Sequence, residues 1–146
     1  MFLKEFNNEE STAFINLVNR FANIDNVLAK EEKRLIKDYI KELGLENIEI
    51  DNLSYDESIN ILKKSKERIK KIAYFELIGL ALVDGNYGDK EVDYLDKIAI
   101  DLDINRSEKI AFANFFYNFK EIYDFSVIET EGKELKHLEE QADALL

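Results

Sequence analysis

Proline is absent from all 146 residues of the chain, and this absence removes the strongest helix breaker. Apolar residues recur at intervals of three and four along most of the sequence, which is the pattern of amphipathic α-helices. A chain of this length forms one domain with a core of its own. With no cysteine present, disulfides and thiolate metal sites are excluded. The sequence therefore predicts an all-α fold, a single-domain bundle of six or seven helices.

Stop and start signals divide this helical pattern. Gly44 is placed to end one helix, and Ser54 followed by Glu57 has the form of a capping box that opens the next. The intervening residues, 46–53, are predicted to be a linker, and Asp84-Gly85 stops a later helix. The expected helices span about 9–24, 30–43, 55–83 with at most one break, 89–102, a segment beginning near 107, and 130–146.

The helix that begins near residue 107 carries an aromatic stripe about 120° wide. The stripe comprises Phe112, Phe115, Phe116, Phe119, Ile122 and Tyr123. Tyr117 and Phe125 lie off it, which leaves two interpretations: an exposed apolar surface for a partner or a second copy of the chain, or a face covered by Leu135, Leu138 and Leu145 of the tail. The predicted core includes Leu35, Ile36, Leu80, Leu95, Ile98, Phe112 and Phe119.

An internal repeat appears when the sequence is shifted by 59 positions. The shift places Ala22, Asp25, Glu32 and Leu43 on Ala81, Asp84, Glu91 and Leu102. Each copy reads as helix, Asp-centred turn, helix, so the two copies are expected to pack as a pseudo-symmetric bundle. The predicted organisation of domain 1–146 is repeat one at about 9–45, the linker at 46–53, repeat two at 54–104, and an aromatic helix and tail at 105–146.

The two copies resemble the halves of a TerB-like domain, the tellurite-resistance B family. The family pattern is an apolar helix ending in Ala-x-x-Asp-Gly, then an apolar residue, then a Glu that opens another apolar helix. The second copy matches it in full through Ala81, Asp84, Gly85, Tyr87 and Glu91. The first copy keeps Ala22, Asp25, Leu28 and Glu32 but has Asn26 in place of Gly, and Asn is the next best residue for a left-handed turn.

This resemblance implies an all-helical domain with no established catalytic activity. It also implies an association with resistance to tellurite, phage and other stresses, beside membrane and calcium-binding partners. Acidic residues of the family have been proposed to bind divalent metal.

Two pairs of acids form the candidate metal site, Asp25 with Glu32 and Asp84 with Glu91, and Asn86 and Asp89 lie close by in the sequence. Pseudo-symmetry would bring the pairs into one cluster of oxygen ligands that suits calcium, magnesium or manganese. The alternative is structural. Asp84 would then form an Asx turn, and Glu91 would complete the hydrogen bonds of a helix start after Gly88.

Charge is distributed unevenly. The chain carries a net charge of -11, and residues 74–146 hold 17 acidic and 7 basic side chains. Such a surface suits a basic partner or a cation and opposes nucleic acid and direct membrane insertion. The only basic run, Lys63 to Lys71, is expected to be a solvated helix face or to pair with the acidic half. No signal peptide or membrane-spanning stretch is visible, so a cytoplasmic location is expected.

Catalysis has no positive signal, because Cys is absent, His137 stands alone on a polar tail, and the glycines form no nucleotide-binding pattern. The leading hypothesis is a non-enzymatic, acidic helical interaction module of a TerB-like stress response to tellurite, metal or phage. Its partner would be a protein, basic or membrane-associated, and a homodimer is an option. The alternative is a small protein that binds a divalent cation through the duplicated Asp and Glu pairs.

Overall fold

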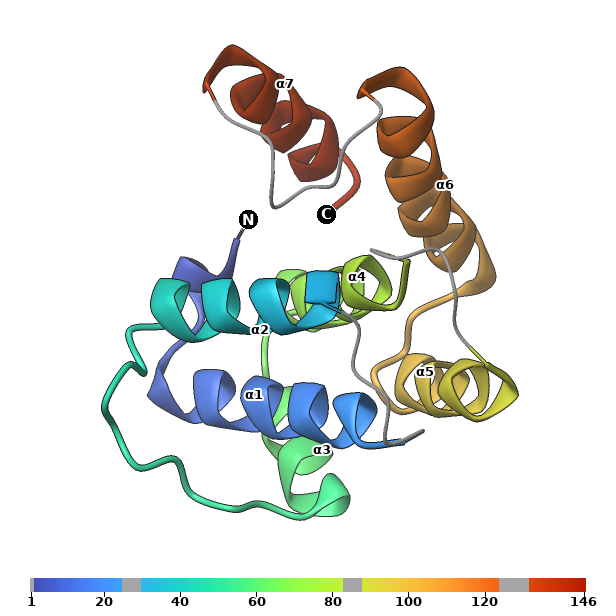
Figure 1. Cartoon of the computed structure of the whole chain (residues 1–146). Coiled ribbons are helices and arrows are strands. Elements are labelled where there is room, and N and C mark those ends of the chain that lie inside the picture. The colour runs from blue at the N-terminus through green and yellow to red at the C-terminus, as the bar shows by residue number, and fades with distance from the viewer. Residues whose placement is uncertain (1, 25–29, 83–87, 124–131) are drawn as a thin grey trace.

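The computed structural model describes residues 2–24, 30–82, 88–123 and 132–146, and the side chains of these residues except 119–123 and 132–135. All regular structure in the described residues is helical, which confirms the all-α prediction. A short 3-10 turn precedes seven α-helices (Figure 1). The elements are η1 (Leu3–Glu5), α1 (Asn8–Ala22), α2 (Lys30–Glu42), α3 (Tyr55–Lys63), α4 (Glu67–Leu82), α5 (Asp89–Asp101), α6 (Arg106–Tyr123) and α7 (Gly132–Asp143).

Local capping chemistry sets several helix ends. Before α3, the Ser54 side chain accepts from the Glu57 backbone N–H and the Glu57 carboxylate accepts from the Ser54 N–H, as predicted. A second capping box, between Asn7 and Glu10, opens α1. After α2, Gly44 has a φ of 70°, the left-handed conformation that only glycine adopts at little cost.

The segment expected to be helical over about 55–83, with at most one break, consists of two helices separated at residues 64–66. The backbone N–H of Ser65 turns back to the Leu62 carbonyl, and the Ser65 hydroxyl donates to the Glu10 carboxylate of α1. The break between the two helices is therefore anchored to α1.

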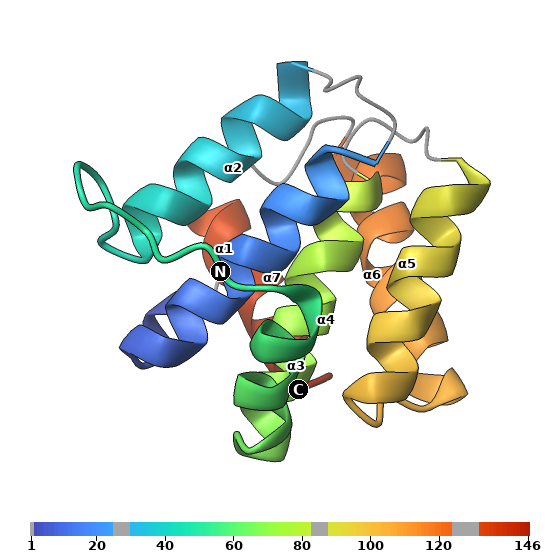
Figure 2. The same ribbon diagram turned by 90° about the horizontal axis from the view of Figure 1, so that it is seen from below.

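Helix α4 is the centre of the fold. From Ile72 to Leu82 it is apolar around nearly its whole circumference, and all of these residues are buried. It packs against α5 and α6 on one side and lies near α2 on another, while α1 packs most extensively on α3. Figure 2 shows α4 in the middle of the bundle, with α1 on one side and α5 and α6 on the other. A helix with no polar face needs neighbours all around it.

Aromatic side chains fill the contact between α4 and α6. Phe75 packs against three rings of α6, with centroid distances of 5.5 Å to Phe112, 5.3 Å to Phe115 and 4.8 Å to Phe116. The predicted aromatic stripe is thus a core face over the part of α6 whose side chains are described. Phe119, Ile122 and Tyr123 lie outside that part.

The other predicted core residues have the expected burial with one exception. Leu35, Leu80, Leu95, Ile98 and Phe112 are buried. Ile36 is only partly buried and packs at the margin of the core. The prediction for Ile36 was wrong because α2 lies at the edge of the bundle. There a narrow stripe of buried side chains, Glu32, Leu35 and Tyr39, makes the contact with the core.

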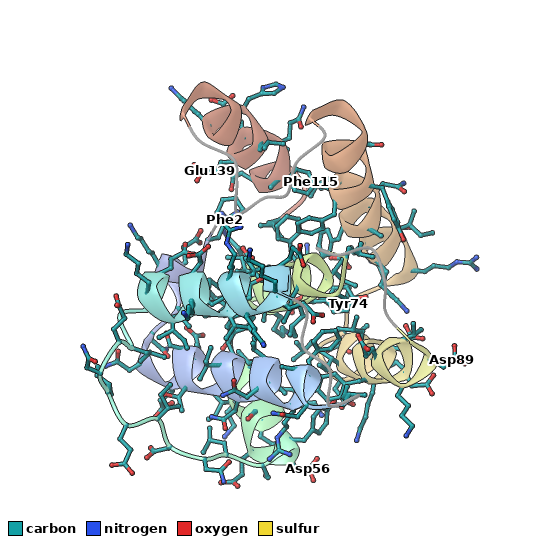
Figure 3. All side chains as sticks on the ribbon, in the orientation of Figure 1. Phe2, Asp56, Tyr74, Asp89, Phe115 and Glu139 are labelled. Atoms are coloured by element: carbon teal, nitrogen blue, oxygen red, sulfur yellow. The ribbon has the colours of Figure 1, made fainter. Side chains whose placement is uncertain are left out.

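Arg68 joins both ends of the described chain to the first turn of α4. Its Nε and Nη2 donate to the two Glu5 carboxylate oxygens at 2.8 and 2.9 Å, and Nη2 also donates to Asp143 of α7 at 2.6 Å. The guanidinium carbon lies 5.6 Å from the centroid of the Phe2 ring. Figure 3 shows Phe2 and Phe115 on the side of the bundle that α7 covers.

Candidate functional site

The predicted acidic motifs are only partly within the described residues. Asp25, Asp84 and Asn86 lie outside them. Glu32, in the first turn of α2, and Glu91, in the first turn of α5, are 6% and 5% exposed, and neither is without an interaction partner. The two carboxylates that the 59-residue shift aligns are therefore both inside the protein.

The helix ends that bound the two motifs share one end of the bundle. Figure 2 shows the last turns of α1 and α4 and the first turns of α2 and α5 on the same side of the molecule. Asp89, by contrast, is exposed and lies at the outer edge of α5 (Figure 3). Among the described side chains, no three His, Asp or Glu residues come together as ligands for one metal ion.

Glu91 also has a role at the start of α5. Gly88 is the N-cap residue, in extended conformation, and the backbone N–H of Glu91 donates to the Gly88 carbonyl at 3.1 Å. A buried carboxylate in a first helical turn is stabilised by the positive end of the helix dipole. Gly88 is thus the helix cap that the structural interpretation of Glu91 assumes, and Glu91 lies seven residues after Asp84 in the sequence.

The basic run of residues 63–71 is largely divided among ion pairs. Lys70 is buried and pairs with Glu67 at 2.8 Å, and Lys71 pairs with Glu108 of α6 at 3.2 Å. Arg68 binds Glu5 and Asp143 as described above. Three members of the run are thus paired, two of them with the acidic half, and only Lys63, Lys64 and Lys66 are exposed.

Large apolar side chains are exposed mainly on α5 and α6. Ile100 of α5 is 75% exposed, and Ile110 and Tyr117 of α6 are 51% and 49% exposed. Ile110 and Tyr117 are seven residues apart and so share one helix face, opposite the buried Phe112. An ion pair of 2.7 Å between Asp96 and Lys109 links the two helices. We call Ile100, Ile110 and Tyr117 the α5–α6 patch.

The tail covers part of the apolar surface and leaves part open. Leu138 and Ala142 of α7 are buried, so the helix folds back on the body, and Asp143 binds Arg68. Tyr117 nevertheless remains half exposed, while Leu135 and Phe125 are outside the described side chains. His137 is exposed on α7 and contacts Gln141 at 3.1 Å, as expected for a residue of a polar tail face.

Two tyrosines link α5 to its neighbours. The Tyr55 hydroxyl donates to Asp101 at 2.6 Å, and the Lys97 ammonium lies 4.2 Å from the Tyr55 ring centroid. The Tyr94 hydroxyl donates to the Leu17 carbonyl at 3.0 Å. Burial raises the pKa of both phenols above the ordinary value, and the Asp101 carboxylate adds to the increase at Tyr55. Both groups therefore act as neutral donors that hold α5 in place.

Two surface hollows were not predicted from the sequence. An open cleft of about 630 Å³ lies where the start of α1 meets the α3–α4 break, and Glu5, Glu10, Ser65 and Arg68 are among its lining residues. A second hollow, of about 490 Å³, is lined by asparagines and Arg20 near the end of α1. Both depend on contacts between segments distant in sequence. The row Asn16, Asn19 and Asn23 is the one sequence signal that points to the second.

No family model, no curated protein and no solved structure matches this chain. The described helices include none with the length and apolar character needed to span a bilayer.

Proposed function

We propose that this chain is a non-enzymatic, acidic helical interaction module that binds a protein partner through the α5–α6 patch. The observation that carries the proposal is the concentration of exposed apolar area there: of the four large apolar side chains exposed in the described residues, three belong to the patch and the fourth is Ile48. Apolar surface gains about 25 cal/mol per Å² when a partner removes it from water.

Charge indicates the nature of that partner. Helix α5 carries five acidic and two basic side chains, and the half of the chain that contains it, residues 74–146, carries most of the net negative charge. Complementary charge accelerates association and favours a basic surface over an acidic one. The TerB-like resemblance assigns such a module to a stress response, and we propose that role for it.

Capture with paired variants tests this function. Ile110→Asn with Tyr117→Asn removes apolar area from a solvent-facing helix surface and leaves the core intact, and Ile48→Asn is the matched control at an exposed position elsewhere. Native lysate should yield a partner with the wild type and the control but not with the double variant. Equal recovery with all three proteins would contradict the proposal. Recovery of the chain itself would identify the partner as a second copy.

The second candidate function is divalent-cation binding by pseudo-symmetric acidic motifs. Its support is that Glu32 and Glu91, which the repeat aligns, are both buried on helices that begin at the same end of the bundle. A cation there would take oxygen ligands from Asp25, Glu32, Asp84, Asn86 and Glu91.

Calorimetric titration with calcium, magnesium and manganese tests the cation function. Asp84→Asn with Glu91→Gln should abolish binding, and Asp25→Asn should weaken it less, because the second copy keeps Gly85 and the larger number of acids. Equal losses from the two copies would indicate one shared site. Absence of heat with all three ions would reject the function while leaving the interaction module untouched.

A further inference from the structure

Asn16 of α1 already recognises an extended main chain within this protein. Its Nδ2 donates to the Asp51 carbonyl at 2.8 Å, and its Oδ1 accepts from the Leu53 backbone N–H at 3.1 Å. This pair of bonds is the one that a neighbouring β-strand would make, since a side-chain amide has the same donor and acceptor as a peptide unit. Figure 2 shows the segment 43–54 running across α1 on its way to α3.

The same face of α1 continues beyond this contact. Asn19, Arg20 and Asn23 follow Asn16 at three, four and seven residues, so they lie along one side of the helix. Arg20 Nη2 donates to the Leu53 carbonyl at 2.8 Å, so a third main-chain group of the linker is bound by α1. Past that point the row borders the hollow of about 490 Å³, which is lined by Asn16, Asn19, Arg20, Asn23, Ile24 and Asn52.

Groups with unused hydrogen-bonding capacity face this hollow. Asn19 and Asn52 are exposed, and their side-chain amides form no hydrogen bond within the described residues. Asn23 Nδ2 donates to the Asn19 carbonyl at 2.7 Å, which leaves its Oδ1 as an acceptor. The Arg20 guanidinium has five N–H donors and uses one on Leu53. None of the described residues that line the hollow is a carboxylate, although the chain as a whole is strongly acidic.

We propose that this hollow binds an extended peptide segment of another protein through its main chain. Side chains four apart on a helix are about 6 Å apart along the axis, and residues on one side of an extended strand repeat at about 6.6 Å. The side chains of Asn19 and Asn23 therefore have the spacing of successive main-chain groups on one side of a strand. The side chains of Asn16 and Arg20 have the same spacing where they bind the linker. Ile24 supplies an apolar wall for one side chain of the bound segment.

This peptide site goes beyond the proposed function, because it lies on α1 and the linker and uses none of the α5–α6 patch. Recognition by main-chain groups makes it tolerant of sequence. Affinity is expected to be modest, since the hollow is open and each neutral hydrogen bond contributes little net free energy.

A nuclear magnetic resonance titration of the full chain tests the proposal. The probe is an acetylated and amidated Thr-Val-Thr-Val-Thr peptide, and the control probe is the same peptide with every main-chain nitrogen methylated. The side-chain amide signals of Asn19, Asn23 and Asn52 should shift with the first probe at millimolar concentration. The methylated peptide should bind about tenfold more weakly or not at all, because it has no N–H to donate.

Variants of the protein complete the test. Asn19→Leu with Asn52→Leu removes two amides of similar volume at exposed positions and should weaken the probe about tenfold. Asn114→Leu, an exposed asparagine of α6, is the matched control and should bind as the wild type does. Shifts confined to other surfaces, or equal binding by both variants, would overturn the peptide site. A failure here with a loss of partner capture by Ile110→Asn and Tyr117→Asn would leave the proposed function standing.

Discussion

Gly79 tests the contact between α4 and α6 more sharply than any other position. A Cβ at this residue would lie 2.7 Å from Cζ and 2.9 Å from Cε1 of the Phe116 ring. Carbon atoms pack at about 3.5–4.0 Å, so Gly79→Ala requires the ring to withdraw by roughly 1 Å. The Phe116 ring is held by Phe75 and by Phe115, whose centroids lie at 4.8 and 5.1 Å.

Two opposing effects decide the sign of this substitution. Alanine gains about 1 kcal/mol over glycine in a helix interior. Overpacking costs about 1–3 kcal/mol, and the blocked ring places Gly79→Ala in the upper half of that range. We expect a net loss of about 1 kcal/mol in the free energy of unfolding and a fall in Tm of roughly 2–4 °C.

A double-mutant cycle measured by thermal and urea unfolding isolates the steric effect. In a Phe116→Leu background the side chain is shorter than the ring, so Gly79→Ala should become neutral or stabilising. A rise in Tm from Gly79→Ala in the wild-type background would refute the reasoning, because it would mean that the ring moves at no cost.

Three further predictions concern capping, pH and the core. Gly88→Ser should raise the free energy of unfolding by roughly 0.3–0.5 kcal/mol in urea titration, because the N-cap backbone is already extended and the substitution would create the Ser-x-x-Glu pattern of a capping box with Glu91. A loss of stability would contradict this. Hydrogen bonds from Arg68 lower the pKa of Glu5 below its ordinary value. The Tm difference between the wild type and Glu5→Gln should therefore be largest near neutral pH and vanish as the pH falls through the lowered pKa. A Tm difference that does not change with pH would show that the Glu5–Arg68 pair is not its cause. Phe112→Ala should cost about 3–5 kcal/mol in denaturant, and an unchanged midpoint would place the ring outside the core.

The sequence predicted best those features of the fold that local chemistry decides. The ends marked by Ser54, Glu57 and Gly44 agree with the structure, because capping side chains and a left-handed glycine act within a few residues. The sequence allowed a break within residues 55–83 but did not place it at 64–66, because Ser65 is held by Glu10, 55 residues away. The turn η1 was missed for the same reason: Leu3 is buried only through tertiary packing.

The candidate sites show the same difference between features set by local sequence and features set by long-range contacts. Helical periodicity predicted a buried face for α6 and set Tyr117 apart from it, and both features are present in the structure. Periodicity cannot report that Asn16 meets Asp51, because that contact depends on the path of the linker. Burial of Glu32 and Glu91 was likewise not predictable from charge, since charged residues in a first helical turn are usually solvated.

The ion pairs of Arg68 have a kinetic consequence. They join residues 5, 68 and 143, so they span nearly the whole chain, and loop closure makes such contacts late events in folding. Interactions that are absent from the transition state slow unfolding without accelerating folding. Arg68→Met should therefore raise the unfolding rate and leave the folding rate nearly unchanged, with the slopes of both chevron arms as in the wild type. The substitution would shorten the lifetime of the native state more than it slows folding.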